Sequence, residues 1–233
     1  MSDARAAVMA ALRDSGSGLD TMARVIRACV DVLPVDGASI SVMSSPRERE
    51  TLYASDEIAT KIEDVQFTLG EGPCFEALAS RKPVLVPDLP RASVLEWPVF
   101  AAAIATLPIG AIFAFPLQAG AIGIGALDLY RRQPGWLSAD ELTMALEVVD
   151  VVTAVLLGLL LSEVDDTTGL RSVMAPGREQ VHQATGMLIA ALGVPAEEAL
   201  SRLRGYAFAR GRSLDEIARD ITSRKLSPLE LAT

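Results

Sequence analysis

The sequence AIFAFPLQAGAIGIGALDLY, residues 111–130, decides the fold of the larger part of this chain. Two apolar runs, residues 111–117 and 122–130, are separated by a short segment that contains Gly120. Glycine readily adopts the positive φ that tight hairpin turns require, and apolar runs of this length between turn signals are typical of strands. The stretch therefore predicts a β-hairpin.

Further strands and a helix are predicted upstream of the hairpin. Residues 37–44 alternate like a half-buried strand, and residues 51–55 and 84–86 have strand composition. Residues 19–33 place apolar side chains at helical spacing, and Pro34 ends that helix. Strands and helices mixed in this way indicate the α+β fold class.

A long helix is predicted over residues 138–164. Ser138 and Glu141 form the pattern of a capping box at its start. Apolar residues then recur in two rows, which need two surfaces to pack against. The sheet can cover one row and a second copy of the helix the other, so we predict a homodimer; complete burial within one subunit is the alternative. The predicted dimer interface consists of Leu142, Leu146, Val149, Leu156 and Leu160, or of the neighbouring row.

Two polar breaks follow the long helix, at residues 165–169 and 175–177. Pro176 and Gly177 disfavour a continuous helix and favour a hinge. The predicted organisation is an N-terminal extension (1–15), a larger domain (16–164), a linker (165–177) and a helical domain (178–233).

The helical domain reads as three short amphipathic helices. Gly193 and Gly211 end the first two helices, and a capping box at residues 213–216 opens the third. Such helices bury their apolar faces against one another in a compact bundle. The residues predicted to face inward are Leu188, Leu192, Leu200, Leu203, Phe208, Leu214, Ile217 and Ile221.

Charge is distributed unevenly along the chain. The net charge is −9. Residues 1–165 carry −10, whereas residues 166–233 carry +1 and hold a cluster of arginines after Arg202. A polyanionic partner would therefore be met by the C-terminal part, because the acidic body repels it.

Composition argues against several classes of function. His182 is the only histidine, and no phosphate-binding loop or nucleophile elbow is present, so we expect no catalytic residues, no enzymatic activity and no cofactor. Cys29 and Cys74 lack metal-ligand spacing, so we expect no metal site and a reducing, cytoplasmic location. The N-terminus does not resemble a signal peptide, and the longest apolar run, residues 151–161, is too short to span a bilayer, so no membrane partner is expected.

Five segments of the larger domain resemble the GAF domains of actinobacterial regulators. The resemblance implies an antiparallel sheet flanked by helices that often senses a small molecule, here unidentified. Cys74 is predicted to be a structural thiol in a loop that shapes the sensor pocket. The segments are LGEGPCFEAL (69–78), VLVPDL (84–89), WPVF (97–100), FAFPL (113–117) and GALDLY (125–130).

The helical domain resembles the ANTAR module of antitermination regulators. The resemblance lies in QATGML (183–188), GVPAEEA (193–199), LR (203–204), Ala207 and SLDEIA (213–218). It implies a dimeric, RNA-binding regulator that grips hairpin loops in nascent transcripts and prevents a terminator from forming.

Proteins read hairpin loops with aromatic rings, arginine planes and amides. This module contains residues of these kinds. Arg204 and Arg212 are the foremost candidates. Thr185 departs from the family, which usually has lysine there. The predicted RNA-binding residues are Gln183, Thr185, Arg202, Arg204, Tyr206, Arg210, Arg212, Arg224 and Lys225.

Two other functions compete with RNA binding. Residues 213–221 look like the first helix of a DNA-binding helix-turn-helix, but only residues 226–233 remain for a recognition helix and Pro228 interrupts them. The second alternative is a ligand-sensing interaction module without nucleic-acid binding. Hairpin RNA, single-stranded RNA and duplex DNA distinguish the three.

Overall fold

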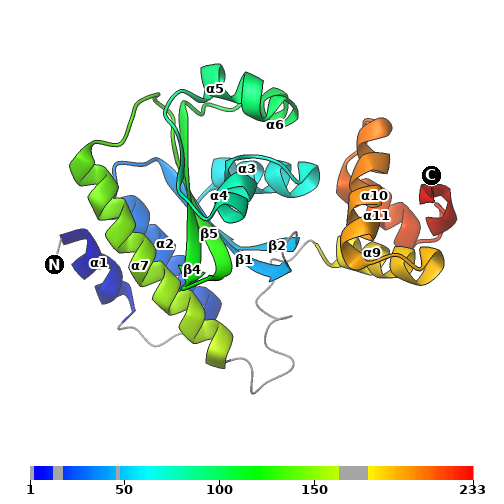
Figure 1. Cartoon of the computed structure of the whole chain (residues 1–233), viewed down its shortest axis with the longest axis horizontal. Helices are drawn as coiled ribbons and strands as arrows, with labels where there is room; N and C mark the ends of the chain where they lie inside the picture. The colour runs from blue at the N-terminus through cyan, green and yellow to red at the C-terminus, as the bar shows by residue number, and fades with distance from the viewer. Residues whose placement is uncertain (1–2, 13–17, 46–47, 163–177, 233) are drawn as a thin grey trace. The chain divides into compact units, whose positions relative to one another are not determined.

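The computed structural model in Figure 1 describes residues 3–12, 18–45, 48–162 and 178–232. The chain divides into two compact units, Met1–Met174 and Ala175–Thr233, and each is described by itself. The linker predicted over residues 165–177, with its hinge, lies outside the described residues. The predicted α+β fold class is confirmed.

The first unit is built on a five-stranded antiparallel sheet in the order β2-β1-β5-β4-β3. The predicted hairpin, β4 and β5, is confirmed, and Gly120 in its turn has a φ of 61°. The strands are β1 (Gly37–Ser45), β2 (Glu48–Ala54), β3 (Val84–Val86), β4 (Ala111–Ala119) and β5 (Ile122–Arg131).

Helices cover both faces of this sheet (Figure 1). Side chains alternate between faces along a strand, so Phe113 and Leu129 join the core on one face while Ile112 and Tyr130 join the core on the other. The first face is covered by α1 (Asp3–Ala11), α2 (Gly18–Val32) and α7 (Ala139–Ser162). The second is covered by α3 (Glu57–Leu69), α4 (Pro73–Ser80), α5 (Leu89–Glu96) and α6 (Pro98–Ile104).

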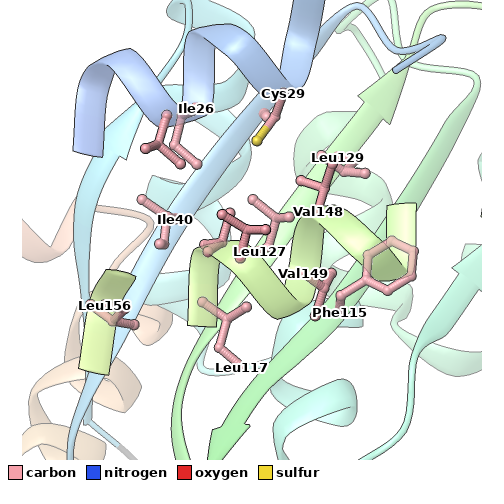
Figure 2. Close-up of a cluster of buried hydrophobic side chains, with 14 of the residues drawn as sticks. Ile26, Cys29, Ile40, Phe115, Leu117, Leu127, Leu129, Val148, Val149 and Leu156 are labelled. Carbon is pink, nitrogen blue, oxygen red and sulfur yellow. The ribbon is translucent and has the colours of Figure 1, made fainter. Parts of the chain in front are cut away.

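Figure 2 shows the larger of these cores, in which Ile26 and Cys29 of α2 face sheet residues such as Ile40 and Leu127. Val148, Val149 and Leu156 of α7 pack into the same cluster. Helices α2 and α7 thus cover this face of the sheet together.

Helix α1 was not anticipated. It lies within the segment assigned above as an N-terminal extension, yet it packs against α2 and α7, and Val8 is fully buried in their core. The described residues of that segment therefore belong to the folded unit.

Helix α7 forms where the long helix was predicted, and the Ser138 hydroxyl and Glu141 carboxylate make the predicted capping box. The residues of the predicted dimer interface differ in exposure, however. Val149 is 9% exposed and Leu156 is 1% exposed, both against the sheet, whereas Leu146 is 43% exposed. A row that repeats every 3.5 residues drifts around a straight helix of 3.6 residues per turn, so part of it turns into the core. Val149 and Leu156 are corrected to core residues, while Leu142 and Leu160 are half-buried.

The apolar length of α7 also bears on membranes. Ala139–Leu161 is long and apolar enough to cross a bilayer by length and composition alone. One side of this helix packs against the sheet. The core helix of a soluble protein can have the same length and apolar composition.

The second unit consists of α9 (Glu179–Leu192), α10 (Ala196–Ala209), α11 (Leu214–Thr222) and the 3₁₀ helix η1 (Pro228–Leu231). Gly193 ends α9 in the left-handed conformation, and Ser213 and Glu216 cap α11 as predicted. Phe208 contradicts its prediction, because it is 66% exposed instead of facing inward. The fully buried interior comes from Val181, Ala184, Leu188, Ala199, Leu203, Ile217, Ala218 and Ile221.

Candidate nucleic-acid interface and sensor pocket

The C-terminal half of α10 and the turn after it hold four of the nine predicted RNA-binding residues, and Arg202 lies at the middle of the helix. Arg202, Arg204 and Tyr206 lie on the helix and are half-buried, while Arg210 and Arg212 lie just beyond its end and are exposed. Backbone hydrogen bonds fold this turn back onto the helix, since the N–H of Arg212 donates to Ala207 O at 3.0 Å. The structure therefore places Arg210 and Arg212 at the end of α10 together with Tyr206, whereas Arg202 lies at the middle of the helix.

Arg202 has a structural task within this group. Its guanidinium pairs with Glu198 at 2.7 Å and donates to the carbonyl oxygens of Leu231 and Ala232 at 3.2 and 2.6 Å. It thereby fastens η1 to α10. Its donors are used inside the unit, so we retain it as a positioning residue, not as an RNA contact.

Arg212 is held by acidic neighbours from α11. The distance from its guanidinium to the Asp220 carboxylate is 2.8 Å and to Glu216 is 3.9 Å. The hydrogen bond to Asp220 raises the pKa of Arg212 above its ordinary value. The side chain is exposed, so an incoming phosphate must compete with these carboxylates.

Arg210 stacks on Tyr206, with 3.9 Å between the guanidinium carbon and the ring centroid. A guanidinium over an aromatic face is a cation–π contact that leaves the edge N–H groups able to donate. The pair presents a flat, charged surface at the end of α10.

The other predicted contacts lie elsewhere. Gln183 is exposed on α9, but Thr185 is 7% exposed and donates its hydroxyl hydrogen to Val181 O at 2.7 Å, so it faces the bundle interior. Arg224 and Lys225 are exposed beyond the end of α11. That helix has nine residues, and at 1.5 Å each it separates them from Arg212 by about 13 Å along its axis.

The first unit contains a buried polar network beneath α3 and α4. The Glu63 carboxylate accepts from Ser39 at 2.7 Å and from Thr51 at 3.0 Å. The Gln66 amide donates to Asp128 at 2.7 Å and accepts from the backbone N–H of Cys74 at 2.9 Å. Sequence patterns give no signal for this network, because its members come from strands and a helix far apart in the chain.

Cys74 is fully buried, as expected of a structural thiol, but it lies in the first turn of α4 instead of the predicted loop and does not line the apolar hollow beside α5 and α6. The preceding Gly72 has a φ of 129°, and a Cβ there would meet the Gln66 side chain at 2.8 Å. The glycine therefore lets the loop close over Gln66.

An apolar hollow of about 380 Å³ opens beside α5 and α6. The side chains that line it are apolar, and among the described residues no His, Cys, Asp and Glu cluster is arranged to hold a metal ion. The lining residues are Leu89, Pro90, Pro98, Ala101, Ala102, Ile104, Ala105, Leu107 and Ile109.

The buried thiol of Cys29 predicts a loss of stability at alkaline pH. Burial raises its pKa from 9.0 to about 12, so the folded chain keeps a proton that the unfolded chain releases. The contribution of the buried, protonated thiol to folding stability is complete below pH 9 and is lost as the pH rises towards 12. Urea unfolding between these values should show a steeper loss of stability in the wild type than in Cys29→Ala. An equal fall of stability with pH in the two proteins would contradict the raised pKa of the Cys29 thiol.

The comparisons with known proteins agree with the division of the chain into two units. The model of the GAF domain matches residues 19–157 and that of the ANTAR domain matches residues 175–221. The search of curated proteins found no match.

Several solved structures resemble the first unit in fold. The GAF domain of an Acinetobacter phosphoenolpyruvate-protein phosphotransferase has a TM-score of 0.52 at 13% identity, covering 70% of this chain and 98% of its own. The corresponding domain from Coxiella burnetii gives 0.52 and 13%, covering 70% and 99%. A domain of a putative two-component sensor histidine kinase from Sinorhizobium meliloti 1021 gives 0.53 and 18%, covering 66% and 99%. At these identities the likeness concerns the fold alone.

Proposed function

The chain belongs to the GAF family and carries an ANTAR domain behind its GAF domain, and from this premise we propose that it is an antitermination regulator that grips RNA hairpins as a dimer. The ANTAR domain is an RNA-binding antitermination domain and the GAF domain is a sensor domain. The target would be hairpin loops in nascent transcripts. The GAF unit would control the grip in response to a small molecule.

The observation that carries this proposal is the group of cationic and aromatic side chains at the end of α10. Arg210 and Arg212 are exposed in the turn that continues α10, with Tyr206 stacked on Arg210. Arg204 lies earlier on the helix, and its Nε and one terminal nitrogen are buried. Arginine forks donate to phosphates, and aromatic rings stack on unpaired bases. The group is suited to a loop, where phosphates and unstacked bases occur together.

The DNA-binding alternative receives less support. A helix-turn-helix needs a recognition helix after the helix that resembles α11. In the described residues that follow α11, the only helical element is η1, Pro228–Leu231, and Arg202 fastens it to α10. A four-residue helix tied down in this way cannot enter a major groove.

The proposal extends to location and chemistry. We propose a cytoplasmic protein without enzymatic activity and without a membrane partner, as befits a regulator of transcription. Nothing in the site requires catalysis, because loop recognition is a binding event.

A transcription assay with purified RNA polymerase tests the proposal. Since the target transcript is unidentified, the probe is a stem-loop that the full chain enriches from an RNA library with a randomised loop. Placed before a terminator, this stem-loop should give read-through that depends on the protein and on the loop sequence. Failure of the chain to enrich any stem-loop, or enrichment without read-through, would contradict the proposed function.

The outer side of α7 predicts the dimer contact. Leu146 and Leu161 are 43% and 65% exposed, with Leu157 half-buried between them, and Met9 of α1 is 44% exposed. Exposed leucines in a line along a helix are covered when a second helix packs beside them. Light scattering should show a dimer for the wild type and a monomer for Leu146→Glu combined with Leu161→Glu.

The control for this experiment is Ile122→Glu, because Ile122 is 69% exposed and belongs to the hairpin instead of α7. It should remain dimeric. A monomeric wild type at micromolar concentration, or a dimer that survives the double substitution, would rule out this interface.

A further inference from the structure

Phe208 is an aromatic residue that the second unit does not use in its own core. It lies on α10, and its side chain is 66% exposed although the helix buries Ala199, Leu203 and Ala207 on its inner side. A single exposed apolar residue is common and needs no explanation by itself. Its surroundings are what make Phe208 informative.

Arginines precede and follow Phe208 along α10 and the turn after it. Arg204 precedes Phe208 by four residues, so the two are neighbours on the helix surface. The turn that follows folds back beside it, because the N–H of Gly211 donates to Phe208 O and the N–H of Arg212 donates to Ala207 O, both at 3.0 Å. Phe208 therefore lies next to Arg204, whose Nε and one terminal nitrogen are buried, and just before the turn that carries the exposed Arg210 and Arg212.

A glycine in the same helix leaves the adjacent surface open. Gly205 lies inside α10, three residues before Phe208, and is exposed. Glycine is unfavourable in a helix interior, and packing does not require it here, since a Cβ at this position would meet nothing within 4 Å. Ser201, also exposed, continues this low surface by one turn. A planar group can approach the backbone beside the ring.

We propose that Phe208 stacks on an unpaired base of the bound RNA and that Gly205 provides the room for this base. A base has a π-face for the ring, and its flanking phosphates can be met by the exposed Arg210 and Arg212. The bases of a duplex are already stacked and cannot reach the ring, so the surface selects the loop of a hairpin. This inference rests on the proposed RNA binding and names the part of the RNA that the unit reads.

The test uses the full chain and the stem-loop enriched by the wild type from the randomised-loop library. Phe208→Ala should weaken binding about tenfold, because one base–aromatic stack is lost. Phe208→Trp should retain wild-type affinity. Leu229→Ala, which truncates another exposed side chain of the same unit, should bind as the wild type. 2-Aminopurine in the loop should be quenched by the wild type and not by Phe208→Ala.

Gly205→Ala provides a second test, in which stability and RNA affinity should change in opposite directions. It should raise the melting temperature, since alanine is the better helix former, and lower the affinity because the methyl group occupies the place of the base. An affinity that stays at the wild-type value would overturn the role of Gly205.

The failures of the two proposals are distinguishable. If the wild type enriches no stem-loop, the proposed function falls and this inference falls with it. If the wild type binds and Phe208→Ala binds equally well, the inference alone is wrong. If Phe208→Ala lowers the dimer content seen by light scattering, the ring serves a protein contact and the inference is again overturned.

Discussion

Replacing Arg204 and Arg212 together with alanine is expected to lower the affinity for hairpin RNA about a hundredfold, because each lost charge-assisted hydrogen bond costs roughly a factor of ten. Each lost phosphate contact should also flatten the dependence of log affinity on log salt by roughly 0.7 for single-stranded RNA. The two measurements together distinguish lost phosphate contacts from a general loss of folding.

Arg212→Ala by itself should leave the melting temperature and the dimer nearly unchanged. Arg204 has buried guanidinium nitrogens, so Arg204→Ala is also measured alone to separate a loss of stability from a loss of RNA contact. Arg212 is exposed, and ion pairs at a surface contribute little to folding, so breaking its contacts with Asp220 and Glu216 leaves the bundle intact. Arg91→Ala is the matched control, since Arg91 also pairs with a carboxylate, Asp88, but in the first unit. Wild-type affinity and an unchanged salt dependence in the double variant would remove both arginines from the site.

Ile217→Ala is expected to destabilise the second unit by about 2–5 kcal/mol, the usual cost of cutting a fully buried isoleucine back to alanine. Ile217 is 0% exposed on α11, which packs against α9 and α10. A unit of this size has a small core, so this loss is a large part of its total stability. Hydrogen exchange in the full chain should accelerate throughout α9, α10 and α11 and stay unchanged in the sheet of the first unit.

Ile189→Ala is the control for this prediction, because it removes the same atoms from the same unit at a position that is 36% exposed. It should leave exchange rates close to those of the wild type. Equal effects of the two substitutions, or acceleration that spreads equally into the sheet, would contradict the core and the independence of the two units.

Local signals predicted much of this fold correctly. The β4–β5 hairpin follows from two apolar runs around Gly120, and the capping boxes at Ser138 and Ser213 follow from a spacing of three residues. These features depend on neighbours in sequence, and the backbone conformation they favour is the one the structure adopts. The end of α9 at Gly193 was predictable for the same reason.

The errors concern side chains whose environment depends on distant elements. Phe208 has a hydrophobic side chain within an amphipathic helix, and composition alone assigns it inward. Thr185 and Arg202 have the right chemistry for RNA, yet a helix carbonyl and the η1 carbonyls take their donors. Val149 and Leu156 follow a regular row but turn into the core as the row drifts around α7. Direction around a helix, set by tertiary packing, decides each case.

The candidate RNA-binding site stays a prediction, and the structure revises which residues can belong to it. Tyr206, Arg210 and Arg212 lie together at the end of α10, where the sequence shows clustered arginines, while Arg204 has buried guanidinium nitrogens. Helix length separates Arg224 from this group, and the sequence does not reveal that Phe208 is exposed among them.

Binding of the full chain to three nucleic acids at physiological salt tests the central claim most directly. The probes are the stem-loop RNA enriched from the randomised-loop library, a single-stranded RNA with the same loop sequence but no stem, and duplex DNA of equal length. The account predicts that the stem-loop binds most tightly, that the single strand binds more weakly and that duplex DNA does not compete. Duplex DNA binding as tightly as the stem-loop, or no binding to any of the three, would contradict it.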